Sequence, residues 1–190
     1  MTLLLFYLVL ALAISFLCSV MESVLLSVTP SFTAAFEEVH PKTGSRLRRM
    51  KTDIDRPLAA ILSLNTIAHT VGAAGVGAQA ATVFGSQYLG AVSAVLTFLI
   101  LILSEIIPKT IGALYWRSLA RPTVVMLRGL IFLLYRLVQL SQLITYLLYK
   151  GEKIKPVTRD EIQALADLGC EEGLFLEKES RILKNLMRFG

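Results

Sequence analysis

Charged and polar side chains follow a long apolar stretch in Leu103-Ser104-Glu105-Ile106-Ile107-Pro108-Lys109-Thr110. The preceding residues, 88–103, carry no charge at all. In hydrocarbon a charged side chain costs at least about 2.5–3.5 kcal/mol, and a proline kinks or breaks the helix that contains it. A carboxylate, a proline and an ammonium together therefore indicate an ion pathway. The alternative is an ordinary helix end at the membrane surface, with charges that face water.

A second group of polar side chains interrupts the apolar stretch at the amino terminus. Ser19, Glu22 and Ser23 share one face of a helix, and Ser27 lies a further turn along. A single serine in a membrane helix usually bonds to its own backbone. A glutamate in the same stripe favours a face that looks into a polar cavity.

The third polar group is a pair, Asn65 and His69, which lie four residues apart on one face of the next apolar stretch. For either residue, an ordinary hydrogen bond between helices is one interpretation. The other is a role as a ligand or, for His69, as a proton carrier.

The three groups are expected at a similar depth in the membrane. At 1.5 Å per residue, Glu22 lies roughly 30 Å along the first helix and Glu105 roughly 25 Å along the third, with Asn65 roughly 12 Å from the inner end of the second. Carboxylates, an amide and hydroxyls predict a cation site with oxygen ligands only. A break at Pro108 would add free carbonyls near Glu105. Lys109 would pair with a carboxylate in the empty site or extend to the membrane surface.

The elements that must position these residues are membrane helices. Of the 190 residues 55% are hydrophobic and only 17% charged, and the mean hydropathy is +0.65. This composition excludes an ordinary soluble domain. We predict an all-α membrane protein with three spans, at residues about 2–28, 57–81 and 88–112. The net charge of +5 does not indicate a nucleic-acid partner, because Lys and Arg are absent before residue 42 and between residues 57 and 108.

The basic residues predict the orientation of the spans. Residues 36–56 contain six Lys and Arg, which marks this segment as cytoplasmic and puts the amino terminus outside a cell inner (plasma) membrane. We expect a solvated loop or short helix there, with contact to anionic lipid as the alternative.

Residues 122–149 are apolar enough for a fourth span. Such a span would export the basic tail and would put Arg128 and Arg136 inside the bilayer. We instead predict a juxtamembrane helix or helical hairpin in the inner leaflet. The transmembrane domain then comprises residues 1–150, and the carboxyl terminus of the chain lies in the cytoplasm.

Residues 151–190 are predicted to form a short cytoplasmic helical linker. Thr158 and Glu161 have the spacing of a capping box at a helix start. The helices carry too little apolar surface to fold alone, so we expect them to lead into a regulatory domain beyond Gly190.

Two further function classes are disfavoured. Cys18 lies in an apolar stretch and Cys170 in a charged one, which does not suggest a disulfide framework. The sequence has neither a nucleophile with a paired base nor a phosphate-binding loop, so we do not expect an enzyme.

The motifs together resemble a known family. Residues 104–109, Ser-Glu-Ile-Ile-Pro-Lys, closely resemble the Gly-Glu-Ile-x-Pro-Lys signature of the membrane domain of the CNNM and CorC proteins. Residues 19–23, Ser-Val-Met-Glu-Ser, resemble the first-helix motif Ser-Gly-Ser-Glu-Thr of that family. Residues 64–69, Leu-Asn-Thr-Ile-Ala-His, resemble its second-helix motif Gly-Asn-x-x-x-Asn. Residues 158–188 resemble the acidic helical linker that precedes its paired CBS domains.

The resemblance implies a homodimeric transporter that exports Mg²⁺, with Na⁺ as the coupling ion, and that is regulated by CBS domains absent from this chain. It implies an ion site made by Ser19, Glu22, Ser23, Asn65, Glu105 and the backbone around Gly112, with Pro108 and Lys109 at the kink. Ser27, His69 and Ser104 are weaker candidates. Met21, Leu64 and His69 depart from the family motifs, and Ser104 does so more mildly.

Two other functions stay open. A membrane scaffold could sense Mg²⁺ and regulate another transporter, although buried carboxylates are not needed for that role. A carrier coupled to protons through His69 and Glu22 is the other alternative.

Overall fold

The structure, a computed structural model, describes residues 1–148, with side chains to residue 144. The described part of the chain is helical, and three of its segments are long and apolar enough to cross a membrane: Thr2–Ser27, Asp55–Phe84 and Ser86–Leu114. The predicted all-α fold with three spans is confirmed. The predicted linker at residues 151–190, with its capping box, lies outside the described residues.

The spans are α1 (Thr2–Ser27), α4 (Asp55–Phe84) and a third, segmented span. The third consists of the 3₁₀ turn η1 (Ser86–Tyr88), α5 (Leu89–Leu99), the π-helix η2 (Ile100–Ile106) and α6 (Ile107–Leu114). The second and third spans are a few residues longer than predicted. Helix α4 starts before Pro57, because a proline in the first helical turn removes no needed hydrogen bond.

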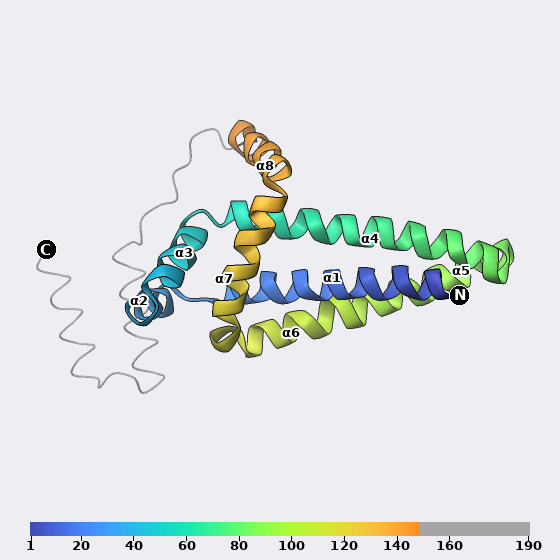
Figure 1. Cartoon of the computed structure of the whole chain (residues 1–190), viewed down its shortest axis with the longest axis horizontal. Helices are drawn as coiled ribbons and strands as arrows, with labels where there is room; N and C mark the ends of the chain where they lie inside the picture. The colour runs from blue at the N-terminus through green and yellow to red at the C-terminus, as the bar shows by residue number, and fades with distance from the viewer. Residues whose placement is uncertain (149–190) are drawn as a thin grey trace, which may run out of the picture. The chain divides into compact units, whose positions relative to one another are not determined.

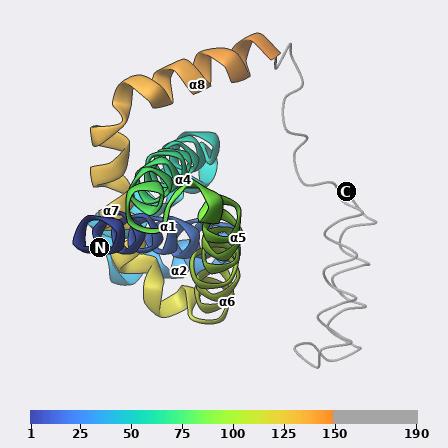
Figure 2. The ribbon, with the colours of Figure 1, turned by 90° about the vertical axis from the view of Figure 1, so that its right-hand side faces the viewer.

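Helix α1 is the central element of the bundle. It packs against α4, against η2 and α6, and against α7. Figure 1 shows α1 running beside α4 and α6 along the long axis, and the end-on view in Figure 2 shows the three spans as one bundle. Small residues permit this packing: a Cβ on Gly72 of α4 would collide with the Cβ of Ala11 on α1. The small residues of α4 therefore bring two backbones into close contact.

Helices α7 (Trp116–Leu133) and α8 (Tyr135–Leu148) form a bent pair with an angle of 85° between them. Figure 1 shows α7 crossing one end of the bundle instead of running along it. One face of α7 is buried, with Ala120, Val124 and Leu127 packed inward. The predicted helical hairpin is confirmed as a bent helix pair, and its position in the inner leaflet stays a prediction. It begins earlier than predicted, because the exposed Pro122 is accommodated within α7.

Two short helices join α1 to α4: α2 (Pro30–Val39) and α3 (Pro41–Thr52). This hydrophilic segment therefore takes the short-helix form of the prediction. The Thr29 side chain caps α2 by accepting a hydrogen bond from the Phe32 amide at 3.3 Å. The Phe32 ring packs edge-on against Trp116 of α7, with 4.8 Å between ring centroids.

Lys51 of α3 fastens this segment to the end of α1. Its Nζ donates a hydrogen bond to the Leu25 carbonyl oxygen at 3.2 Å. The last carbonyls of a helix have no partner within the helix and carry partial negative charge, so a cation is favourable there. Burial lowers the pKa of Lys51 from its ordinary value.

We predict that Gly72→Ala destabilises the domain by about 1–3 kcal/mol, because the new methyl group overpacks the contact with Ala11. Gly77 of the same helix is the matched control, since a Cβ there would meet no atom within 4 Å. Gly77→Ala should be neutral or slightly stabilising, because alanine favours helix. Thermal unfolding of both variants in detergent measures the difference. Equal midpoints would contradict the close α1–α4 packing.

Candidate cation site

The third span changes its helical form directly before Pro108. Residues Ile100–Ile106 are π-helical, and the amide of Ile107 donates to the carbonyl of Ile102, five residues earlier. Proline has no N–H to offer the carbonyl four residues before it, which here belongs to Ser104. That carbonyl instead accepts a hydrogen bond from Ser19 Oγ of α1 at 2.6 Å. The predicted break at Pro108 is thus a widened helical turn. The carbonyl of Ser104 that this turn leaves free is satisfied by Ser19 of another span.

The serine face of α1 contacts this third span along two turns. Ser23 Oγ donates to the Lys109 carbonyl oxygen at 2.6 Å. A Cβ on Gly112 would lie 2.7 Å from Ser23 Cβ and 2.9 Å from the Val20 carbonyl oxygen. Only glycine therefore allows α6 to approach α1 so closely. Gly112, which the family resemblance implied as a backbone ligand, lies in this contact.

The two membrane carboxylates meet at one lysine. Lys109 Nζ lies 3.1 Å from Glu105 Oε2, one helical turn away, and 3.4 Å from Glu22 Oε2 on α1. Asn65 of α4 donates a hydrogen bond from Nδ2 to Glu105 Oε1 at 3.1 Å. The structure thus brings Glu22, Asn65 and Glu105 together from three spans, as their depths suggested, with Lys109 between the acids.

His69 extends this cluster through a residue that sequence reasoning missed. Its Nε2 lies 2.6 Å from the hydroxyl of the buried Ser15 and 3.8 Å from Glu105 Oε1. Ser15 precedes Ser19 by one helical turn, so the stripe of serines on α1 was the signal that could have found it.

The weaker candidates differ in their positions. Ser104 is buried, and its hydroxyl donates to the Ile100 carbonyl of its own helix at 2.8 Å, the ordinary role of a membrane serine. Ser27 is the last residue of α1, one turn beyond Ser23. Among the described residues it adds no hydrogen bond to the cluster.

The cluster has features that suit a cation. Two carboxylates face one ammonium, so the group carries a net negative charge when all three are ionised and His69 is neutral. Asn65 Oδ1 is buried and accepts no hydrogen bond from the described residues. A buried acceptor without a donor is costly, and a cation would satisfy it.

The acidic groups alone do not make a metal site. Within residues 1–148, no three His, Cys, Asp or Glu side chains are grouped so as to hold a metal ion. A cation at Glu22 and Glu105 would therefore need the Asn65 amide and hydroxyl, carbonyl or water oxygens to complete its ligands.

Comparison with known proteins finds one matching family and several relatives of this chain. The family model for the Cyclin M transmembrane N-terminal domain (CNNM) matches residues 6–179. The UPF0053 protein sll1254 of Synechocystis is 29% identical over 174 residues, which are 92% of this chain and 50% of that protein. The UPF0053 inner membrane protein YfjD of Escherichia coli is 29% identical over 140 residues, 74% of this chain and 32% of that protein.

A plant relative extends the similarity. The DUF21 domain-containing protein At1g55930, chloroplastic, of Arabidopsis thaliana is 27% identical over 184 residues, 93% of this chain and 28% of that protein. The chain spans half or less of the length of these three relatives. The family model covers most of the chain and every residue of the cluster, which confirms the resemblance seen in the motifs: the chain belongs to the CNNM transmembrane domain family.

Proposed function

We propose that this domain carries Mg²⁺ across a membrane through the cluster of Glu22, Asn65 and Glu105. The observation that carries the proposal is the position of Lys109, whose ammonium lies between two carboxylates from different spans. A lysine there supplies the positive charge that the acids require while the site holds no ion. Membership of the CNNM family supports magnesium as the cargo.

The ligand chemistry favours a hard cation. Magnesium prefers oxygen ligands and gives up its water reluctantly, so a site for it must offer strong, well-placed oxygens. Glu22, Glu105 and the Oδ1 atom of Asn65 are such oxygens. The hydroxyls of Ser19 and Ser23 already donate to carbonyls of the third span, and their lone pairs remain free to accept or to ligate.

The proposed mechanism exchanges the lysine for the metal ion. The side chain of Lys109 is 45% exposed, against 20% for Glu22 and 23% for Glu105, so it can withdraw towards water while the acids stay. An entering Mg²⁺ sheds water and takes its place between the carboxylates. A rearrangement near Pro108 then opens the site to the other side, and Na⁺ entering overlapping carboxylate positions drives the return.

The wider setting is also a proposal. We infer a homodimer in a cell membrane, with the amino terminus outside and the basic α3 segment in the cytoplasm. We also propose a regulatory domain of the CBS type as a partner, because the relatives extend well beyond the region that matches this chain.

One rival transporter has an observation in its favour. His69 lies between Ser15 and Glu105, so it could carry a proton to or from that carboxylate. This modifies the earlier proton-carrier alternative, since the partner of His69 is Glu105 and not Glu22. A scaffold that senses Mg²⁺ would use the same cluster for binding without flux.

Glu105→Gln tests the proposed site. We predict that Na⁺-dependent Mg²⁺ flux in proteoliposomes falls to background, because the variant loses a ligand charge and the Lys109 pair. Glu38→Gln, on the exposed face of α2, is the matched control and should keep full flux. Full flux in Glu105→Gln would overturn the proposal. If wild type binds Mg²⁺ in a titration but carries none, the scaffold is correct.

Lys109→Met tests the exchange of lysine for metal. Removing the competing ammonium should tighten Mg²⁺ binding by about 5- to 30-fold, the effect of about 1–2 kcal/mol. Lys42→Met, on exposed α3 sequence, is the control and should leave the affinity unchanged. Calorimetric titration of the purified protein gives both values. Unchanged or weaker binding in Lys109→Met would show that the ammonium does not compete with the ion.

His69→Gln separates the two transport mechanisms. Glutamine keeps a hydrogen bond to Ser15 but cannot carry a proton, so the proposed Na⁺-coupled flux should retain its rate and its dependence on Na⁺. We would measure flux between pH 6 and pH 8 for both proteins. Flux that depends on pH in wild type and not in the variant would favour the proton-coupled carrier.

A further inference from the structure

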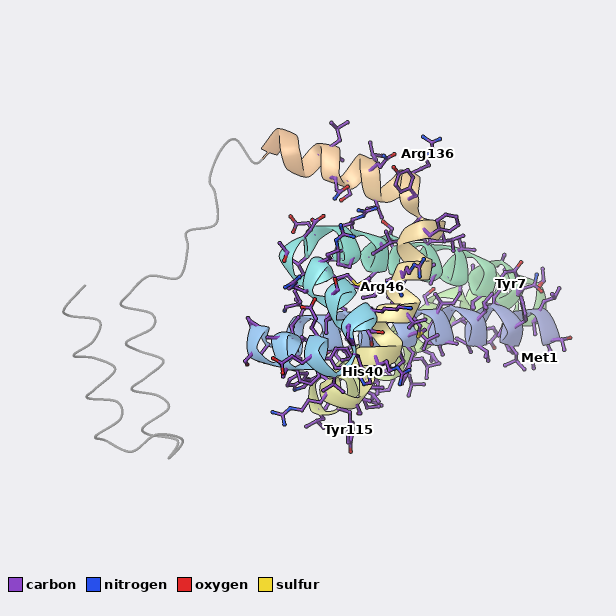
Figure 3. The ribbon with its side chains drawn as sticks, turned by 60° about the vertical axis from the view of Figure 1, so that its left-hand side comes forward. Met1, Tyr7, His40, Arg46, Tyr115 and Arg136 are labelled. Atoms are coloured by element: carbon purple, nitrogen blue, oxygen red, sulfur yellow. The ribbon has the colours of Figure 1, made fainter. Side chains whose placement is uncertain are left out.

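A cleft of about 700 Å³ lies between α3, the first turn of α4 and α7. It is separate from the cation site and has the opposite charge. Five arginines line it, with one acidic residue, Asp53: they are Arg46, Arg48, Arg49, Arg56 and Arg128. Figure 3 shows Arg46 on α3 beside the crossing of α7. Like charges that converge on one cleft repel one another, so this arrangement favours a bound anion.

The described residues leave most of this positive charge uncompensated. Arg48 Nη1 pairs with Glu37 Oε2 at 3.3 Å. Asp53 Oδ2 accepts a hydrogen bond from Gln142 Nε2 of α8 at 3.5 Å. The Nε–H group of Arg56 is buried and has no acceptor among residues 1–148. A buried donor without a partner costs about 1–3 kcal/mol. An anion with several oxygens would satisfy it and the neighbouring guanidinium groups at once.

The position of the cleft indicates where the anion comes from. Arg56 and Pro57 line the cleft and stand at the start of α4, and no Asp, Glu, Lys or Arg follows in the chain until Glu105. The cleft therefore lies where the charged segment meets the membrane span, at the level of lipid headgroups.

The walls of the cleft are partly apolar. Met50, Pro57 and Ile131 line it with the arginines, and the neighbouring surface of α7 exposes Val125, Phe132 and Leu133. A free phosphate ion gains nothing from contact with apolar walls. The glycerol and acyl chains of a lipid can pack against them.

We propose that this cleft binds the phosphate of an anionic lipid headgroup. Guanidinium groups hold phosphate oxygens in paired hydrogen bonds, and basic pockets at the cytoplasmic side of membrane proteins attract acidic headgroups. A bound lipid would join α3, α4 and α7 at the membrane surface. This inference does not depend on the transport proposed for the acidic cluster.

The test measures binding of phosphatidylglycerol to the purified chain, by native mass spectrometry of lipid adducts and by thermal unfolding in phosphatidylcholine vesicles with and without phosphatidylglycerol. Wild type should retain phosphatidylglycerol over phosphatidylcholine and unfold at a higher temperature in its presence. Arg46→Gln/Arg49→Gln removes two exposed cleft arginines without disturbing the core. We expect affinity for phosphatidylglycerol to fall about fivefold for each arginine removed. Arg56→Gln should have a similar effect.

Arg121→Gln/Arg136→Gln is the matched control, because it removes the same charge from exposed positions outside the cleft. Figure 3 shows Arg136 on α8, well apart from Arg46. The control should keep wild-type lipid binding. An equal loss in both double variants would overturn the proposal in favour of diffuse attraction to the membrane. Stabilisation by inorganic phosphate that equals that by phosphatidylglycerol would overturn it in favour of a free-phosphate site.

Discussion

Charges inside an apolar bundle must have partners, and the arrangement of this domain follows from that constraint. Glu22 and Glu105 lie on separate spans, and Lys109 lies within 3.4 Å of the first and 3.1 Å of the second. The attraction between them acts at short range, and the two carboxylates are mostly shielded from water, with side chains 20% and 23% exposed. It requires α1 and the third span to meet face to face, and Asn65 then brings α4 to the same place. The bundle is thus assembled around its most costly residues.

Close contacts between helix backbones also hold the spans together. Gly72 lets α4 touch α1 at Ala11, and Gly112 lets α6 touch α1 beside Ser23. Packing between such small surfaces is the usual source of association between membrane helices. Here it also brings hydroxyls of α1 within reach of carbonyls in the third span. Packing and polar pairing therefore reinforce each other along a single helix face.

Sequence reasoning predicted the parts of this structure that follow from hydropathy and charge. Charge-free stretches give the length of each membrane helix, and that length gives the depth of each polar residue in the membrane. The sequence therefore predicted the three spans, the bent helix pair and the meeting of Glu22, Asn65 and Glu105. The bond of Ser15 to His69 was missed, because the stripe of serines on α1 puts Ser15 on the face of the cluster but does not specify its partner. The start of α7 before Pro122 was missed because an exposed proline within a helix has the same sequence pattern as one at its beginning.

The π-helix η2 has a geometric consequence for the span that contains it. A π turn holds one more residue than an α turn, and each residue of an α-helix advances the chain by about 100° around the axis. Conversion of η2 to α-helix would therefore rotate α6 by roughly that angle relative to α5. Lys109, with Glu105 beside it, would turn away from Glu22 of α1 while α5 stayed in place against α4. Any rotation of α6 relative to α5 would thus be taken up within the seven residues of η2.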